Sequence, residues 1–111
     1  MEKVTTYRTY ITQLLEQLGA ELPSSSEVDT EYIFDTAHDH YQLFQVGWEQ
    51  YQWIHGCIVH VDIKNNKIWI QHNGTELPLA EEFVSLGVPK EDIVLGFQAP
   101  YKRKYTGYAE Q

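Results

Sequence analysis

The stretch that most constrains the fold runs from Trp53 to Ile63 and reads WIHGCIVHVDI. It is rich in β-branched and aromatic residues, which predicts a strand. Its side chains fall on the two faces of a strand as follows: His55, Cys57, Val59, Val61 and Ile63 on one, Ile54, Ile58 and His60 on the other. Because apolar residues occupy both faces, we expect a central strand that is covered on both sides. The same alternation places His55 and His60 on opposite faces.

Two strands are predicted before this one. In VDTEYIFDT, from Val28 to Thr36, apolar residues and threonine alternate with acidic residues, which indicates a half-exposed strand. In HYQLFQVGW, from His40 to Trp48, Leu43 lies on the face opposite to the other apolar side chains. AHDH supplies the turn between these two strands. Each strand therefore offers one face to a core.

A fourth strand is predicted after a tight turn. Asn65 and Asn66 tolerate positive φ, so KNNK predicts a hairpin that leads into KIWIQ. Four consecutive strands with short links make an antiparallel meander. After the second helix and the short turn that follows it, both described below, we expect only an irregular tail.

Two helices flank the predicted strands. Apolar residues recur with helical spacing at Val4, Tyr7, Ile11, Leu14, Leu15 and Leu18, and this helix ends near Gly19. A second helix begins after Pro78 and ends at Gly87, and Pro89 opens one further short turn, KEDI. With 111 residues the chain is a single domain, residues 1–111, of the α+β class: a four-stranded antiparallel sheet with an N-terminal and a C-terminal helix.

Two helices of this length cover one face of such a sheet. Either a second copy of the chain covers the other face, which predicts a homo-oligomer, or the tail folds over it. No apolar run approaches the roughly 20 residues of a membrane span, and MEKVTTYRTY lacks the apolar core of a signal peptide. We therefore expect a cytoplasmic protein that does not contact a membrane.

Charge is distributed unevenly along the chain. The formal net charge is −8, which argues against a generic nucleic-acid binder, since such proteins neutralise phosphates with basic residues. Three of the eight basic residues stand together near the C-terminus as Lys102, Arg103 and Lys104. With neighbouring tyrosines they resemble an interaction edge, and the candidate partner-binding residues are Tyr101, Lys102, Arg103, Lys104, Tyr105 and Tyr108.

No recognised catalytic or nucleotide-binding motif occurs, so we expect no enzyme, no catalytic residue, no cofactor and no metal. Asp39, His40 and His60 form a candidate polar cluster. An alternative hypothesis is a metal-dependent enzyme that uses Asp35, His38 and His40. The lone Cys57 is interpreted as a small core residue, because His55 beside it on the same strand is poorly oriented to act as its base.

The three tryptophans allow two interpretations. Trp48, Trp53 and Trp69 either pack in the core, as aromatic residues in strands commonly do, or stack on bases or anchor a partner. The scarcity of positive charge disfavours base stacking.

The chain resembles the XisI family, whose members are named as controlling factors for excision of the fdxN element in cyanobacteria during heterocyst differentiation. The most specific matching segments are DHYQL, GW, KIWIQ, NGTE, GVPK, DIVLGF and YTG, from Asp39 to Gly107. The resemblance spans nearly the whole chain.

This resemblance implies a non-catalytic accessory role beside a site-specific recombinase and a second controlling factor, XisH. It assigns no catalytic residue. Two alternatives remain: direct DNA binding at the excision site through the basic tail, and inhibition of a nuclease-like XisH protein.

Overall fold

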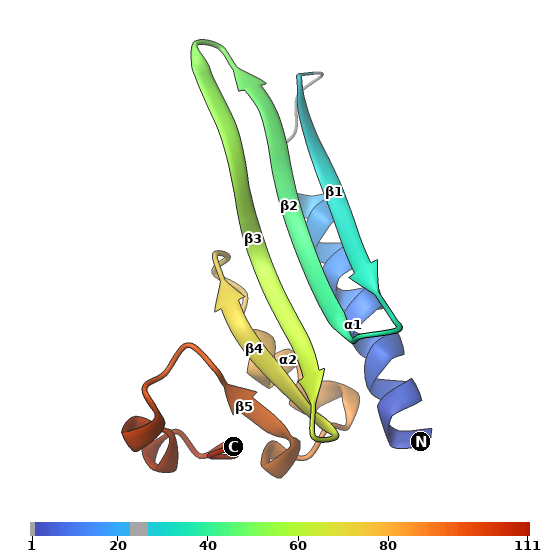
Figure 1. Ribbon diagram of the computed structural model, residues 1–111, viewed down its shortest axis with the longest axis vertical. Helices are drawn as coiled ribbons and strands as arrows, with labels where there is room; N and C mark the ends of the chain where they lie inside the picture. Colours follow the sequence, from blue (N-terminus) through green and yellow to red (C-terminus); the bar gives the residue numbers. More distant parts are fainter. Residues whose placement is uncertain (1, 23–26) are drawn as a thin grey trace.

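Strand β3 (Gln52–Lys64) lies at the centre of a five-stranded sheet in the computed structural model, which describes residues 2–22 and 27–111 (Figure 1). The other strands are β1 (Val28–Asp35), β2 (His40–Glu49), β4 (Lys67–Asn73) and β5 (Ile93–Leu95), and their order is β1-β2-β3-β4-β5. The first four pair antiparallel, as predicted. Asn65 and Asn66 both have positive φ, 55° and 63°, which confirms the tight turn between β3 and β4.

The prediction of a four-stranded, purely antiparallel sheet is wrong, because β5 adds a fifth strand parallel to β4. Ile68 pairs with Ile93 and Ile70 with Leu95. A three-residue strand is too short to show an alternating pattern, so the sequence alone does not distinguish it from an irregular tail. The connection from β4 to β5 passes through α2, as a parallel pair requires a crossover.

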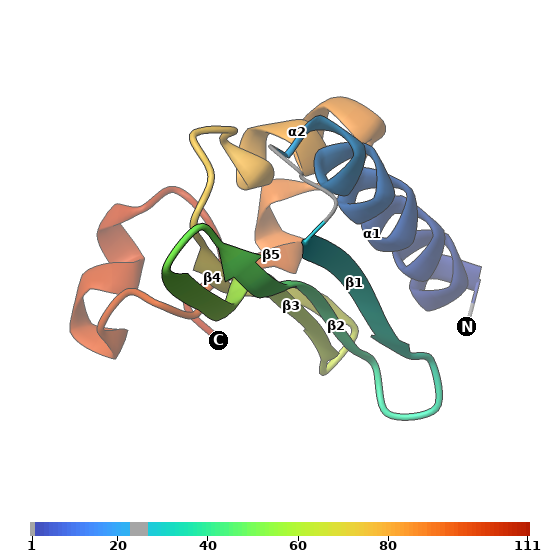
Figure 2. The same ribbon diagram turned by 90° about the horizontal axis from the view of Figure 1, so that it is seen from above.

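Both α-helices lie on the same face of the sheet (Figure 2). α1 (Glu2–Glu21) and α2 (Leu79–Leu86) confirm the two predicted helices. Gly87 ends α2 with φ 112°, a left-handed conformation in which backbone N–H groups reach the carbonyl oxygens of Phe83 and Val84. The turn predicted after Pro89 is a 3-10 helix, η1 (Lys90–Asp92).

The hydrophobic core lies between these helices and the sheet. It joins apolar residues of both helices to one face of the strands, and its fully buried members include Ile11, Leu15, Tyr41, Leu43, Val59, Val61, Ile68, Leu79, Phe83 and Ile93. One side of α1 and one face of the sheet therefore contribute to a single core.

A register shift changes which face the side chains of β3 occupy. Leu43 pairs with Val59 and Phe44 with Cys57, so Ile58 has no partner on β2 and packs against the core beside Val59. His55 then lies on the open face of the sheet, away from the helices, where its ring packs against Phe44 at 5.5 Å between ring centroids.

His60 lies on this open face too, since it pairs with Gln42, two residues from Phe44 along β2. The prediction that His55 and His60 occupy opposite faces is wrong for this reason: strict alternation fails at the shift. The same shift moves Cys57 away from the core face of Val59.

The C-terminal segment lies beside the edge strand β5 (Figures 1 and 2). It contains a 3-10 helix, η2 (Pro100–Tyr105), and returns so that the N–H of Ala109 donates to the carbonyl oxygen of Ile93 at 2.8 Å. The tail therefore extends the β5 edge, and only part of it reaches over the open face.

Within residues 2–22 and 27–111, no helix is both long and apolar enough to cross a membrane.

Candidate functional site

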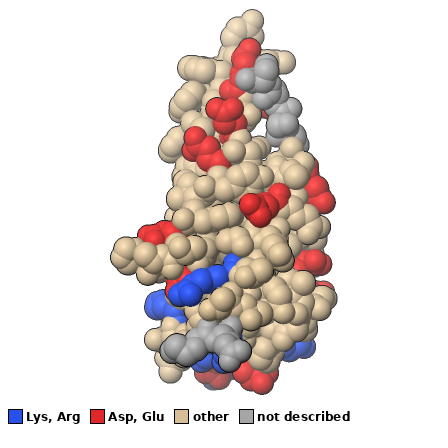
Figure 3. Space-filling view, turned by 90° about the vertical axis from the view of Figure 1, so that its right-hand side faces the viewer, with Lys and Arg blue, Asp and Glu red and all other residues tan. Residues whose placement is uncertain are grey.

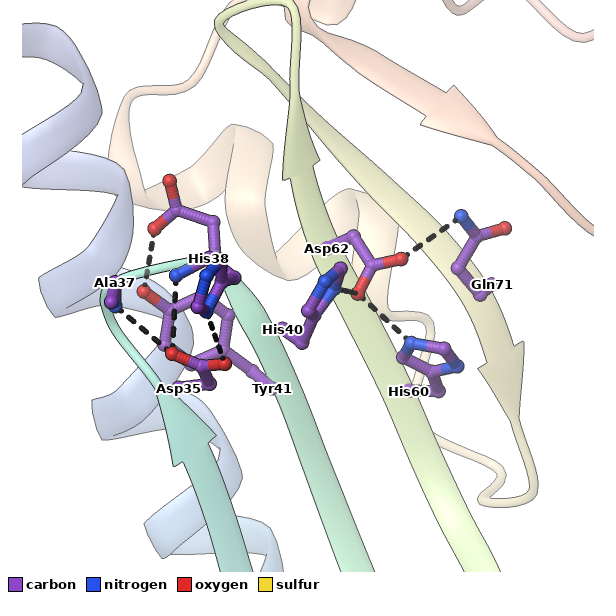
Figure 4. Close-up of polar contacts among 9 residues, drawn as sticks. Asp35, Ala37, His38, His40, Tyr41, His60, Asp62 and Gln71 are labelled. Atoms are coloured by element: carbon purple, nitrogen blue, oxygen red, sulfur yellow. Dashed lines mark hydrogen bonds and ion pairs between the residues drawn. The ribbon is translucent and has the colours of Figure 1, made fainter.

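A polar cluster on the open face of the sheet centres on Asp62 (Figure 4). His40 Nδ1 lies 3.0 Å and His60 Nε2 2.9 Å from the same carboxylate oxygen, Oδ1 of Asp62. Gln71 Nε2 donates to the other oxygen, Oδ2, at 3.3 Å. We call these four residues the Asp62 cluster.

Strand pairing brings the Asp62 cluster together. His40 and Asp62 are direct partners across β2 and β3, and His60 precedes Asp62 by two residues on β3, so all three share a face. Gln71 has no partner on β3, because the register shifts between His60 and Val61. Gly96 leaves room for Gln71: a Cβ atom on this glycine would lie 2.2 Å from Oε1 of Gln71.

Asp62 is nearly buried, with 8% of its surface exposed, and a buried carboxylate requires hydrogen-bond donors. Two imidazoles and one amide supply them. The hydrogen bond to Asp62 raises the pKa of His40, since the carboxylate stabilises the protonated ring. The cluster thus concentrates two imidazole nitrogens on one carboxylate oxygen.

Asp39, which the sequence grouped with His40 and His60, has different partners. Its carboxylate accepts hydrogen bonds from Arg8 at 2.7 and 3.1 Å and from the Tyr41 hydroxyl at 2.9 Å. The hydrogen bond from Arg8 lowers the pKa of Asp39. The structure therefore brings His40 and His60 together around Asp62, a residue that sequence reasoning missed although the HVD spacing places it on the same strand face as His60.

The alternative metal trio of Asp35, His38 and His40 does not converge in the structure. His38 Nδ1 lies 2.9 Å from Oδ2 of Asp35 in the turn between β1 and β2, whereas His40 binds Asp62 (Figure 4). The hydrogen bond from His38 lowers the pKa of Asp35, whose other oxygen accepts the backbone N–H groups of Ala37 and His38. Asp35 and His38 thus stabilise a turn.

The six candidate partner-binding residues of the tail divide into two groups. Tyr101 and Tyr105 are 71% and 78% exposed, and Lys102 and Lys104 beside them are exposed as well. We call these four residues the tail edge. Arg103 and Tyr108 instead lie half-buried within the protein, Tyr108 against the core.

Arg103 stabilises the tail from within. Its guanidinium donates to the carbonyl oxygens of Gln98 at 3.1 Å and Gly96 at 3.2 Å, and it stacks over the Trp69 ring at 5.2 Å from the centroid. Lys64 approaches the same ring at 4.4 Å. The basic triplet is therefore one structural arginine between two exposed lysines.

The three tryptophans also differ in their exposure to solvent. Trp69 is buried with 7% exposure, whereas Trp48 and Trp53 are about half exposed and pack on each other, with ring centroids 5.4 Å apart. Tyr51, at the turn that joins β2 to β3, is 99% exposed. Trp69 is therefore a packing residue, although it lies on the open face beneath Arg103 and Lys64. Trp48, Tyr51 and Trp53 form a group of exposed aromatic residues at the far end of the β2–β3 hairpin.

Cys57 is held by its own strand. Its Sγ donates to the carbonyl oxygen of Val59 at 3.2 Å, and burial raises the pKa of the thiol. A protonated, half-buried thiol is a poor nucleophile, as predicted. The prediction of a core residue is wrong, because the register shift pairs Cys57 with Phe44 on the open face of the sheet.

Charge on the surface follows the uneven distribution in the sequence. Figure 3 views the side formed by α1 and β1: acidic side chains appear along the length of this face, whereas basic ones appear only in its lower half. The upper part of this face is therefore acidic.

Comparison with known families identifies the chain. The model of the XisI protein family matches residues 1–110. The chain belongs to the XisI family. A XisI-like protein from Anabaena variabilis ATCC 29413 is 46% identical, with a TM-score of 0.91 over 95% of this chain and 96% of the other.

A second XisI structure from Anabaena variabilis ATCC 29413, described as the fdxN element excision controlling factor XisI, is 33% identical. Its TM-score is 0.83 over 98% of this chain and 99% of the other. No curated protein matches the chain. The family is thus named for control of excision rather than for a reaction.

Proposed function

We propose that this XisI-family chain is a non-catalytic accessory factor for site-specific excision of a DNA element, and that it acts by binding other proteins. The observation that carries the proposal is the match to the XisI family over residues 1–110, together with the similarity to a protein described as an excision controlling factor. The partners are a XisH-like protein, the recombinase, or both.

The tail edge supplies the contact surface. Tyr101 and Tyr105 place two large aromatic rings in solvent, and tyrosine is among the residues that contribute most to binding energy when an interface buries them. Lys102 and Lys104 flank these rings with positive charge on a protein whose formal net charge is −8. Such a surface complements an acidic patch on a partner, since opposite charges steer association.

The experiment is co-elution of the purified chain with a purified XisH-like protein, and separately with the recombinase, from the same genome at low salt. We expect a complex with at least one of them. Replacing both Tyr101 and Tyr105 by alanine should weaken it at least about tenfold, because truncation of a buried aromatic anchor commonly costs about 2 kcal/mol or more.

Tyr51→Ala is the matched control. It removes a tyrosine that is 99% exposed at the opposite end of the protein and should leave the complex unchanged. Absence of a complex with both partners, or equal weakening by Tyr51→Ala, would contradict the proposal.

Direct DNA binding is a second candidate, supported by Lys102 and Lys104, which remain exposed. It predicts an electrophoretic shift of the excision site that survives competitor DNA and disappears in the Lys102→Ala, Lys104→Ala double variant. The formal net charge of −8 disfavours direct DNA binding. In addition, two lysines neutralise too few phosphates for tight binding at physiological salt.

A further inference from the structure

The Asp62 cluster holds three metal-ligating side chains at one point of the open sheet face. Among the residues that the structure describes, His40, His60 and Asp62 form the group whose ligand atoms all lie within 4.8 Å of one another. They belong to two adjacent strands, β2 and β3, so a rigid backbone fixes their relative positions.

We propose that His40 Nδ1, His60 Nε2 and Asp62 Oδ1 bind one divalent transition-metal ion such as Zn²⁺. This differs from the expectation of the sequence analysis, which foresaw no metal, because the sequence did not bring Asp62 to these histidines. Two imidazoles and one carboxylate form a typical three-residue donor set for Zn²⁺, and the fourth position is then open to water or to another ligand.

The distances suit such an ion after small side-chain rotations. Bonds of about 2.0–2.2 Å to zinc place neighbouring ligand atoms of a tetrahedral site roughly 3.3 Å apart. The two nitrogens lie 3.0 and 2.9 Å from the carboxylate oxygen. An ion requires them to separate from that oxygen by a few tenths of an ångström, which exposed His40 can accommodate.

The hydrogen bonds of Asp62 also match those of a metal-ligating carboxylate whose orientation is fixed by a neighbouring side chain. Both imidazoles converge on Oδ1, while Gln71 binds Oδ2 and fixes the plane of the carboxylate. Amide contacts of this kind orient the carboxylate ligands of metal sites. Gly96 leaves room for this position of the amide, since a Cβ atom there would lie 2.2 Å from Oε1 of Gln71.

When both histidines are neutral, binding of the ion neither releases nor takes up a proton. The N–H···O hydrogen bonds to Asp62 are replaced by bonds from the ring nitrogens to the metal. Each ring then carries its proton on the other nitrogen, Nε2 of His40 and Nδ1 of His60. His40 has 56% of its side chain exposed, so an ion can enter from solvent.

The test is titration of the chelator-treated full chain with Zn²⁺ by calorimetry, and with Co²⁺ by visible absorption. We expect one ion per chain, and no measurable binding of Mg²⁺, which prefers oxygen ligands. His40→Ala, His60→Ala and Asp62→Asn should each weaken Zn²⁺ binding at least about tenfold. Gln71→Ala should weaken it by about 10- to 100-fold, as loss of a group that orients a ligand does.

His38→Ala and His72→Ala are the matched controls. His38 is exposed in the turn between β1 and β2, and His72 pairs with His60 across the sheet but is not one of the three ligands. Both variants should bind Zn²⁺ as the natural chain does.

Three results would overturn the proposal: no saturable binding of Zn²⁺ by the natural chain, equal weakening by the two control variants, or unchanged binding by His40→Ala and His60→Ala. His40→Ala keeps the test decisive even if Asp62→Asn does not fold, because His40 is largely exposed and its loss leaves no cavity in the core.

Discussion

The Tyr7 hydroxyl donates a buried hydrogen bond of 2.5 Å to Oδ2 of Asp92, 85 residues further along the chain. Lys3 also contacts Oδ2, at 2.8 Å. Burial acts against the charged form of Asp92, but the hydrogen bonds from Lys3 and Tyr7 outweigh it and lower the pKa of the carboxyl group. This contact joins α1 to η1, the 3-10 helix that directly precedes β5.

Removing the Tyr7 hydroxyl should therefore destabilise the fold. Tyr7→Phe leaves a buried carboxylate with one donor fewer, and we expect the free energy of unfolding to fall by about 1–3 kcal/mol. Urea denaturation followed by tryptophan fluorescence measures it. Tyr10→Phe on the same helix is the control and should change stability by less than about 0.5 kcal/mol; an equal loss in both variants would contradict the role of Asp92.

The contact between Arg8 and Asp39 should make stability depend on pH. The pKa of Asp39 is lower in the folded protein than in the unfolded chain, chiefly through the hydrogen bond from Arg8. Its contribution is therefore complete above the unfolded value of about 4 and is lost as the pH falls through the lower folded value.

Asp39→Asn tests this dependence. Asparagine tolerates the positive φ of 61° at this position, so the backbone is not strained. Unfolding measured from pH 7 to pH 2 should show the natural chain more stable than the variant at neutral pH and the difference shrinking below about pH 4. A difference that stays constant down to pH 2 would refute the ion pair.

Gly47 should not tolerate substitution by a residue with a side chain. Its φ is 145°, and a Cβ atom there would lie 2.0 Å from the carbonyl oxygen of Glu27. Gly47→Ala should lower the free energy of unfolding by about 1–3 kcal/mol or more, since both strain and overlap act. Gly56→Ala is the control, because a Cβ atom there meets nothing within 4 Å, and its thermal unfolding should match that of the natural chain.

The three basic residues of the tail should differ in their effect on stability. Arg103→Ala removes hydrogen bonds to the carbonyl oxygens of Gln98 and Gly96 and the stacking on Trp69, so we expect a loss of about 1–3 kcal/mol. Lys102→Ala and Lys104→Ala should stay within about 0.5 kcal/mol. Chemical denaturation of the three variants measures this, and equal stabilities would show that Arg103 does not hold the tail.

Regular, local patterns were enough to predict much of this fold. The helical spacing of α1, the alternation of β1 and the NN turn each depend on residues close in sequence, and the structure confirms them. β5 was missed because the pairing of Ile93–Leu95 with β4 depends on the intervening helix, not on a pattern within three residues. The faces of His55 and His60 were misjudged because one unpaired residue, Ile58, inverts the alternation.

The Asp62 cluster shows the same limit. The sequence pointed to His40 and His60, but their common partner depends on the register between β2 and β3. The register shift at Ile58, which the sequence pattern does not reveal, brings Asp62 opposite His40. The tail shows it again: Lys102, Arg103 and Lys104 look equivalent in sequence, yet a 3-10 helix turns only Arg103 inward.

Binding of the excision-site duplex, measured by fluorescence anisotropy at physiological ionic strength, tests the central claim most directly. The chain is assayed alone and together with the XisH-like protein and the recombinase. A factor that acts through protein contacts should leave the duplex free when alone and join it only when a partner protein is present. Tight, sequence-selective binding of the duplex by the isolated chain would contradict this account.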